Sequence, residues 1–214
     1  MRCGLSIVAV DDCRVSQLVL LDLSAALDAV DHQVLLCVLS DRFGISGTAL
    51  NWFESYLSDR TQSFVHTGHT TAYFSVTCSV PHGSVFGPLG FIAYTDDLTA
   101  VSDRHNIHSH MYADDTQLYD SSPLVDAESV RDHLTSCVSE VAKWCASRRL
   151  QLNDDKTEMI WFGSRSNLAK LQRINLSLQV GTSNIQPSSV VRSLLLASTT
   201  FVVCARLVVR SARK

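Results

Sequence analysis

Residues 17–23 (QLVLLDL) form an apolar run in which the next-to-last residue is an aspartate, Asp22. This pattern is typical of a strand that is buried on both faces and delivers the carboxylate of Asp22 at its end. A chain of 214 residues that is 46% hydrophobic and 18% charged can bury such a strand in one domain, or in a domain with an appendage. Taken alone, Asp22 also fits a helix N-cap or a turn.

Helical and strand-like patterns follow one another along the rest of the chain. Apolar spacing predicts helices over residues 32–43, 48–57, 83–100 and 126–148, and strands over 62–66, 72–78, 158–162 and 176–180. Residues near 163–167 and 181–189 are predicted as loops. Residues 108–119 predict a hairpin with two acids at its turn. We therefore expect an α+β fold, a mostly antiparallel sheet with helices packed on one face.

Those two adjacent acids are Asp114 and Asp115, in the segment MYADDTQLY. Like charges in a half-buried hairpin repel each other and lose hydration, so a cation would stabilise the pair. Mg²⁺ prefers carboxylate oxygen, and Asp22 could complete a two-metal site for phosphoryl transfer if it met the pair in space. An exposed turn, in which aspartate is common, explains the local pattern equally well.

Five motif blocks occur in a fixed order along the chain: residues 20–32 (LLDLSAALDAVDH), 43–62 (FGISGTALNWFESYLSDRTQ), 79–91 (SVPHGSVFGPLGF), 110–119 (HMYADDTQLY) and 150–164 (LQLNDDKTEMIWFGS). In this order they resemble the reverse transcriptases of non-LTR (LINE-type) retrotransposons. The resemblance implies a truncated, diverged copy with a palm-like sheet and incomplete fingers and thumb. Residues 1–165 would form the palm with a remnant of the fingers, and residues 166–214 a diverged segment at the start of the connection or thumb.

The resemblance also implies a catalytic set. Asp22, Asp114 and Asp115 would bind two Mg²⁺ ions, with Mn²⁺ as an alternative, and Leu23 would add its backbone carbonyl. Lys156 matches a lysine that protonates the leaving pyrophosphate or neutralises its charge. A lysine among acidic neighbours is also typical of a solvated surface charge.

A second set of residues would contact the incoming nucleotide: Leu27, Pro81, His82 and Gly83. Leu27 stands where the family usually has a phenylalanine that excludes the ribonucleotide 2′-hydroxyl, so we expect weaker rejection of ribonucleotides. His82 replaces a glutamine and loses the paired donor and acceptor of the amide, which would misplace the nucleotide.

Three further positions depart from the family pattern. Ser79 replaces a glycine, and Phe86 and Gly90 each replace a leucine. A glycine inside a helix costs about 1 kcal/mol relative to alanine before any change in core packing is added.

By resemblance, the chain is an RNA-directed DNA polymerase domain that uses an RNA template, a DNA primer and dNTPs, with impaired activity. Its net charge of −3 offers little attraction for phosphates and argues against a simple RNA-binding module. An inactive palm remnant that acts as a binding module is the alternative. Trp52, Phe53 and Tyr56 allow base stacking, but their helical spacing favours core packing.

The remaining features concern location. The seven cysteines contain no CxxC pair, so we interpret them as thiols in a reducing compartment. Residues 2–10 fit an ordinary strand better than a signal peptide. Residues 193–205 are uncharged but too few to cross a bilayer. We expect a nuclear or cytoplasmic protein that is neither secreted nor membrane-bound.

Overall fold

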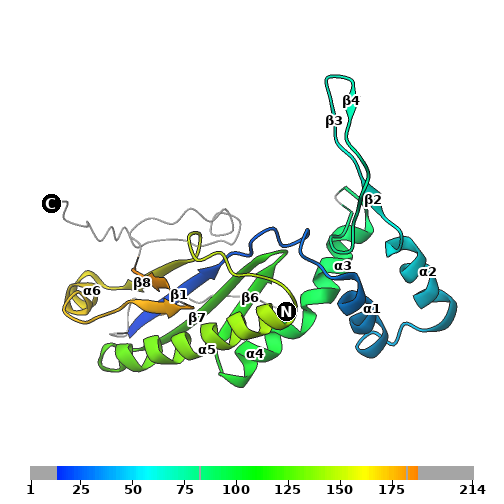
Figure 1. Ribbon diagram of the computed structural model, residues 1–214. Coiled ribbons are helices and arrows are strands. Elements are labelled where there is room, and N and C mark those ends of the chain that lie inside the picture. The colour runs from blue at the N-terminus through cyan, green and yellow to red at the C-terminus, as the bar shows by residue number, and fades with distance from the viewer. Residues whose placement is uncertain (1–13, 82, 182, 188–214) are drawn as a thin grey trace. The chain divides into compact units, whose positions relative to one another are not determined.

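The predicted buried strand forms as β1 (Arg14–Leu21) in a computed structural model that describes residues 14–81, 83–181 and 183–187 (Figure 1). The described chain divides into two units. The sheet unit comprises residues 14–23, 99–143, 152–181 and 183–187, and the helical unit comprises residues 24–81, 83–98 and 144–151.

The sheet unit is built on four antiparallel strands in the order β6-β7-β1-β8. The partners of β1 are β6 (His108–Tyr112), β7 (Asp115–Pro123) and β8 (Glu158–Gly163). Val19 lies between Leu118 on β7 and Met159 on β8, and each of these side chains is at most 1% exposed. The central strand is therefore buried between neighbours, as its apolar run predicts.

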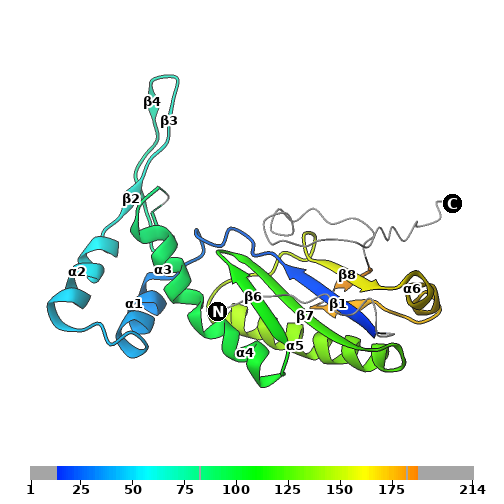
Figure 2. The same ribbon diagram turned by 180° about the vertical axis from the view of Figure 1, so that it is seen from behind.

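Helices cover one face of this sheet. Figures 1 and 2 show α4 (Thr99–Arg104) and the long α5 (Ala127–Ser147) on the same face, with η3 (Leu124–Asp126) leading into α5. Buried Val130, Leu134, Val138 and Val141 recur at helical spacing along α5. An α+β fold with an antiparallel sheet is confirmed.

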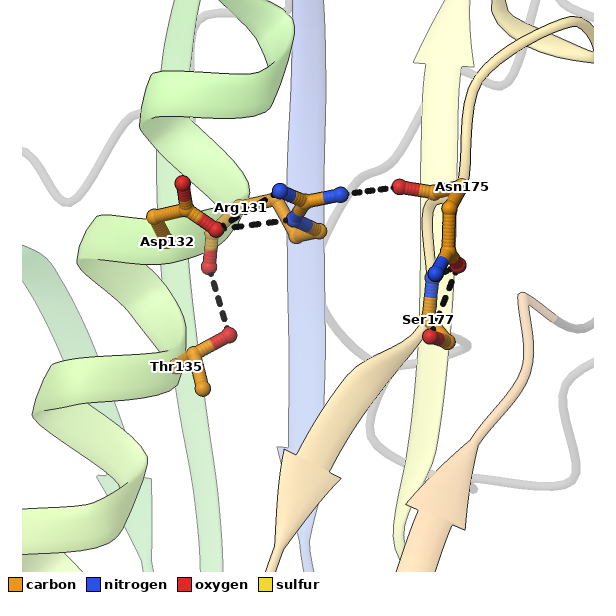
Figure 3. A network of polar contacts seen from close by, with 5 residues as sticks. All are labelled: Arg131, Asp132, Thr135, Asn175 and Ser177. Atoms are coloured by element: carbon orange, nitrogen blue, oxygen red, sulfur yellow. Dashed lines mark hydrogen bonds and ion pairs between the residues drawn. The ribbon is translucent and has the colours of Figure 1, made fainter.

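The end of the described chain also belongs to the sheet unit. It forms α6 (Arg165–Leu171) and a small antiparallel sheet of β9 (Leu178–Val180) and β10 (Ser183–Ile185). Arg131 on α5 donates to the carbonyl of Asn175, and Ser177 donates to the Asn175 side chain over 2.8 Å (Figure 3). The Arg131 contact joins the segment before β9 to α5, and the Ser177 contact lies within that segment. The division at residue 165 stays a prediction.

The helical unit contains α1 (His32–Asp41), α2 (Gly47–Leu57), α3 (Phe86–Thr95) and η2 (Asp96–Leu98). A hairpin lies between α2 and α3 in sequence, with β2 (Thr61–Gln62) paired to β5 (Phe74–Ser75) and β3 (Val65–His66) paired to β4 (His69–Thr70). Asp31 caps α1, because its Oδ1 accepts the Val34 amide over 2.9 Å. Its other carboxylate oxygen accepts from Arg149.

Several predicted elements differ in the structure. The helix expected over residues 83–100 begins later, at Phe86, because Gly83 has a left-handed backbone, and it is divided into α3, η2 and α4. α6 forms where a loop was predicted, because Ser164 caps it and Leu168 and Leu171 are buried. β10 also lies in a predicted loop, and its strand pairing with β9 is too short to leave a sequence pattern.

The aromatic residues of α2 were expected in the core, and this expectation is wrong for Trp52. Its side chain is 55% exposed and stacks on Tyr56, with ring centroids 5.3 Å apart. Phe53 and Tyr56 are partly buried and pack against Phe86 of α3. Across the described residues, the structure contains no helix of the length and hydrophobicity that a bilayer crossing requires. Residues 193–205 lie outside the described residues.

Candidate active site

The hairpin predicted around the adjacent acids is formed by β6 and β7. Tyr112 pairs with Asp115, so Ala113 and Asp114 make a two-residue turn. Ala113 adopts a left-handed backbone with φ 53°, which a turn of this length requires at one or both central positions. Asp114 is therefore at the turn, and Asp115 is the first residue of β7.

The sheet register carries Asp22 to the same place. Leu21 is paired with Thr116, so one further step along both antiparallel strands sets Asp22 opposite Asp115. Residues that face each other in this way have Cβ atoms roughly 4.5–5.5 Å apart. Two carboxylates distant in sequence therefore lie side by side at one end of the sheet, with Asp114 adjacent.

The electrostatics of Asp115 reflect this clustering. Its pKa is raised from the ordinary aspartate value, first by burial and then by the negative charges of Asp114 and Asp22. The positive charge of Lys156 partly lowers the pKa again. The site thus holds more negative charge than its surroundings compensate.

Lys156 forms an ion pair with Asp22. Its Nζ lies 3.3 Å from Asp22 Oδ2, yet this buried oxygen accepts no hydrogen bond of acceptable geometry. The two observations agree if the ammonium neutralises the carboxylate without directing an N–H at it. The Lys156 side chain is 66% exposed and that of Asp22 is 22% exposed.

The backbone around Asp22 positions both groups. The Asp22 carbonyl accepts the Asn153 amide over 2.9 Å, and Leu23 forms a bridge with Leu152. Carbonyls alternate in direction along an extended chain, so the Leu23 carbonyl is directed away from this contact.

These groups suit a hard divalent cation. They offer carboxylate oxygens and a backbone carbonyl, which Mg²⁺ prefers, and the buried Asp22 Oδ2 has no hydrogen-bond donor. Within residues 14–81, 83–181 and 183–187, however, no three His, Cys, Asp or Glu side chains already converge as metal ligands. The three carboxylates therefore lie at the same end of the sheet without forming a ready-made set of metal ligands.

The expected nucleotide-contacting residues belong to the helical unit, where two segments run side by side. The Val80 amide donates to the Leu27 carbonyl over 3.0 Å, and the Ser79 amide donates to the Val30 carbonyl over 2.8 Å. The first bond ties Leu27 to the residue that precedes Pro81. Gly83 has φ 76° with open space around its α-carbon, and His82 lies outside the described residues.

Two departures from the family pattern have structural consequences. Ser79 has φ 86°, a backbone conformation that suits the glycine it replaces. A Cβ on Gly90 would lie 3.1 Å from Cζ of Phe86, so the smaller residue makes room for the larger ring one turn earlier. The two leucine replacements therefore compensate each other.

Sequence analysis missed two residues that support the candidate site, Ser84 in the helical unit and Asn153 in the sheet unit. The Ser84 hydroxyl donates to the Pro81 carbonyl over 2.7 Å and accepts the Gly87 amide over 2.9 Å. It joins the loop to the start of α3, and a serine just before a helical run is the signal that could have indicated it. Asn153 acts through its backbone, for which side-chain identity gives no signal.

Comparison with known proteins supports the resemblance. A family model described as reverse transcriptase (RNA-dependent DNA polymerase) matches residues 11–186. A curated relative, the probable RNA-directed DNA polymerase from transposon BS of Drosophila melanogaster, is 29% identical over 156 residues. The match covers 70% of this chain and 17% of the relative, so the chain spans about a sixth of that protein's length.

Proposed function

Because this chain belongs to the reverse transcriptase (RNA-dependent DNA polymerase) family, we propose that it extends a DNA primer on an RNA template by transfer of nucleotides from dNTPs. We further propose that it derives from a non-LTR (LINE-type) retrotransposon, on the strength of its five ordered motif blocks. The observation that carries this proposal is the pairing of Leu21 with Thr116, which sets Asp22 and Asp115 at adjoining strand ends, where the charge of Asp22 raises the pKa of Asp115.

In this proposal Asp22, Asp114 and Asp115 hold two divalent cations, Mg²⁺ or Mn²⁺, and Leu23 adds its carbonyl. The bound cations would lower the pKa of the primer 3′-hydroxyl and stabilise the charge that leaves with pyrophosphate. Lys156 would bring a positive charge to the same leaving group. Its long exposed side chain allows the ammonium to move between Asp22 and a phosphate.

The helical unit would recognise the nucleotide. Leu27 and the loop of residues 81–83 would contact its sugar and base, supported by the hydrogen bond between Val80 and Leu27. Leucine is smaller than the usual phenylalanine and would exclude the ribose 2′-hydroxyl less strictly. With a net charge of −3 the chain offers little attraction for phosphates and would hold the template weakly.

The test is primer extension on an RNA template with Mg²⁺ or Mn²⁺ at low ionic strength. We expect extension by the full chain and a loss of at least about 100-fold in Asp115→Asn, because a metal ligand supplies several kcal/mol of transition-state stabilisation. Asp126→Asn removes an equal charge from η3 and is the matched control. Absence of extension would favour a non-catalytic palm remnant, whereas extension that is equal in Asp115→Asn and wild type would remove Asp115 from the proposed catalytic set.

A further inference from the structure

The ammonium of Lys156 lies where the proposed site most needs positive charge. Its sequence neighbours include Asp154 and Asp155, yet the ion pair of Lys156 is formed with Asp22, which directly follows β1. Its charge also acts on Asp115, the other facing carboxylate. One cationic group thus serves two proposed metal ligands at once.

The contact between Lys156 and Asp22 differs from that of a well-formed structural ion pair. Lys156 Nζ is 3.3 Å from Asp22 Oδ2, but that oxygen is buried and lacks a hydrogen bond. A dedicated structural ion pair would satisfy such an oxygen with a directed N–H. Here the carboxylate keeps its lone pairs available for another cation.

The backbone of Lys156 is held by hydrogen bonds, whereas its side chain is largely exposed to solvent. The Lys156 and Thr157 amides both donate to the Asn153 carbonyl, over 3.1 and 2.9 Å, and the Asn153 amide donates to the Asp22 carbonyl. The turn is therefore joined to the strand end that carries the carboxylate. Because the Lys156 side chain is 66% exposed, its ammonium can withdraw into water at little cost.

We propose that Lys156 occupies the cation position at Asp22 while the site holds no divalent ion, and that a metal ion enters by displacing the ammonium. This inference rests on the metal site of the proposed function. Lys156 then acts as a positioning residue that keeps the carboxylates together and sets the concentration at which divalent ions load. A positive charge beside the site also repels the incoming ion until it moves away.

The test is binding of Mn²⁺ to the full chain, followed by the loss of the free-ion electron paramagnetic resonance signal and requiring no catalysis. Lys156→Met keeps the length of the side chain and removes the competing charge. We expect Mn²⁺ to bind about fivefold more tightly, which corresponds to about 1 kcal/mol for the displaced exposed ion pair. Lys156→Arg keeps the charge and is expected to bind within about twofold of wild type.

Lys170→Met removes the same unit of charge from α6 and controls for the change in net charge; its affinity is expected to match wild type. Equal or weaker binding in Lys156→Met, with binding still lost in Asp115→Asn, overturns the displacement and leaves the metal site standing. Saturable binding in none of the variants rejects the metal site and this inference together. Unfolding curves of each variant without metal show that the comparison is made on folded protein.

Discussion

Replacing Ser79 by glycine tests whether the loop beside Leu27 is held in a strained conformation. Ser79 has φ 86°, where a Cβ costs an L-residue roughly 1–2 kcal/mol. Glycine removes that strain but loses about 0.5–1 kcal/mol of chain entropy, and the contacts of the Ser79 hydroxyl are long, at 3.2 and 3.4 Å. The net gain of Ser79→Gly is therefore about 0–1 kcal/mol.

A comparison with alanine isolates the strain. Ser79→Ala keeps the Cβ and loses the hydroxyl, so we expect Ser79→Gly to exceed Ser79→Ala in unfolding free energy by about 1 kcal/mol. Ser55 is the matched control, because it is exposed in the interior of α2 in the same unit. At this helical position the order reverses, and the unfolding free energy of Ser55→Ala is expected to exceed that of Ser55→Gly by about 1 kcal/mol.

Urea unfolding followed by tryptophan fluorescence measures both pairs, and a change in midpoint at constant slope reports the change in stability. Equal stabilities of Ser79→Gly and Ser79→Ala, or a more stable alanine variant, would refute the strain argument. The Ser55 pair shows whether the assay resolves differences of this size.

Three further outcomes are expected. In urea unfolding, Gly90→Ala is expected to destabilise the chain despite alanine's higher helix propensity, because its Cβ would lie 3.1 Å from Phe86. In a Phe86→Leu background the same change is expected to stabilise the chain. A stabilising effect of Gly90→Ala alone would contradict the packing argument. Burial raises the pKa of Cys145 to about 12. Iodoacetamide is therefore expected to label exposed Cys37 in the folded protein and Cys145 only after unfolding, as mapped by mass spectrometry. Equal labelling of the two thiols in folded protein would refute the burial of Cys145. Leu27→Phe sharpens discrimination against ribonucleotides in primer extension, and unchanged discrimination removes the proposed role of Leu27.

Local sequence patterns predicted the elements whose pattern is long or sharply bounded. β1, α1 and α5 match their apolar periods, and the predicted hairpin forms with its turn one residue earlier than the acid pair, at Ala113 and Asp114. The short α6 and β10 were missed, because their few residues are stabilised by tertiary burial and strand pairing rather than by a repeating pattern. The same limit explains Trp52, whose helical spacing indicated a buried face but not what would cover it.

The candidate site needed information that no local pattern holds. The sequence indicated a cation near Asp114 and Asp115, but the meeting of Asp22 with Asp115 follows from the pairing of β1 with β7. The contact of Lys156 with Asp22 depends in turn on the backbone bond from Asn153. The compensation between Phe86 and Gly90 was likewise invisible, because each substitution looks harmful when it is considered separately.

Metal-directed backbone cleavage tests the central claim, that carboxylates distant in sequence share one cation. Fe²⁺ replaces Mg²⁺ in the full chain, and ascorbate with peroxide generates radicals that cut only the backbone near the ion. We predict cuts near Asp22 and near the Ala113–Asp114 turn together, suppressed by excess Mg²⁺ and lost in Asp22→Asn. Cuts at one segment alone, or cuts unchanged by Asp22→Asn, would contradict a shared site.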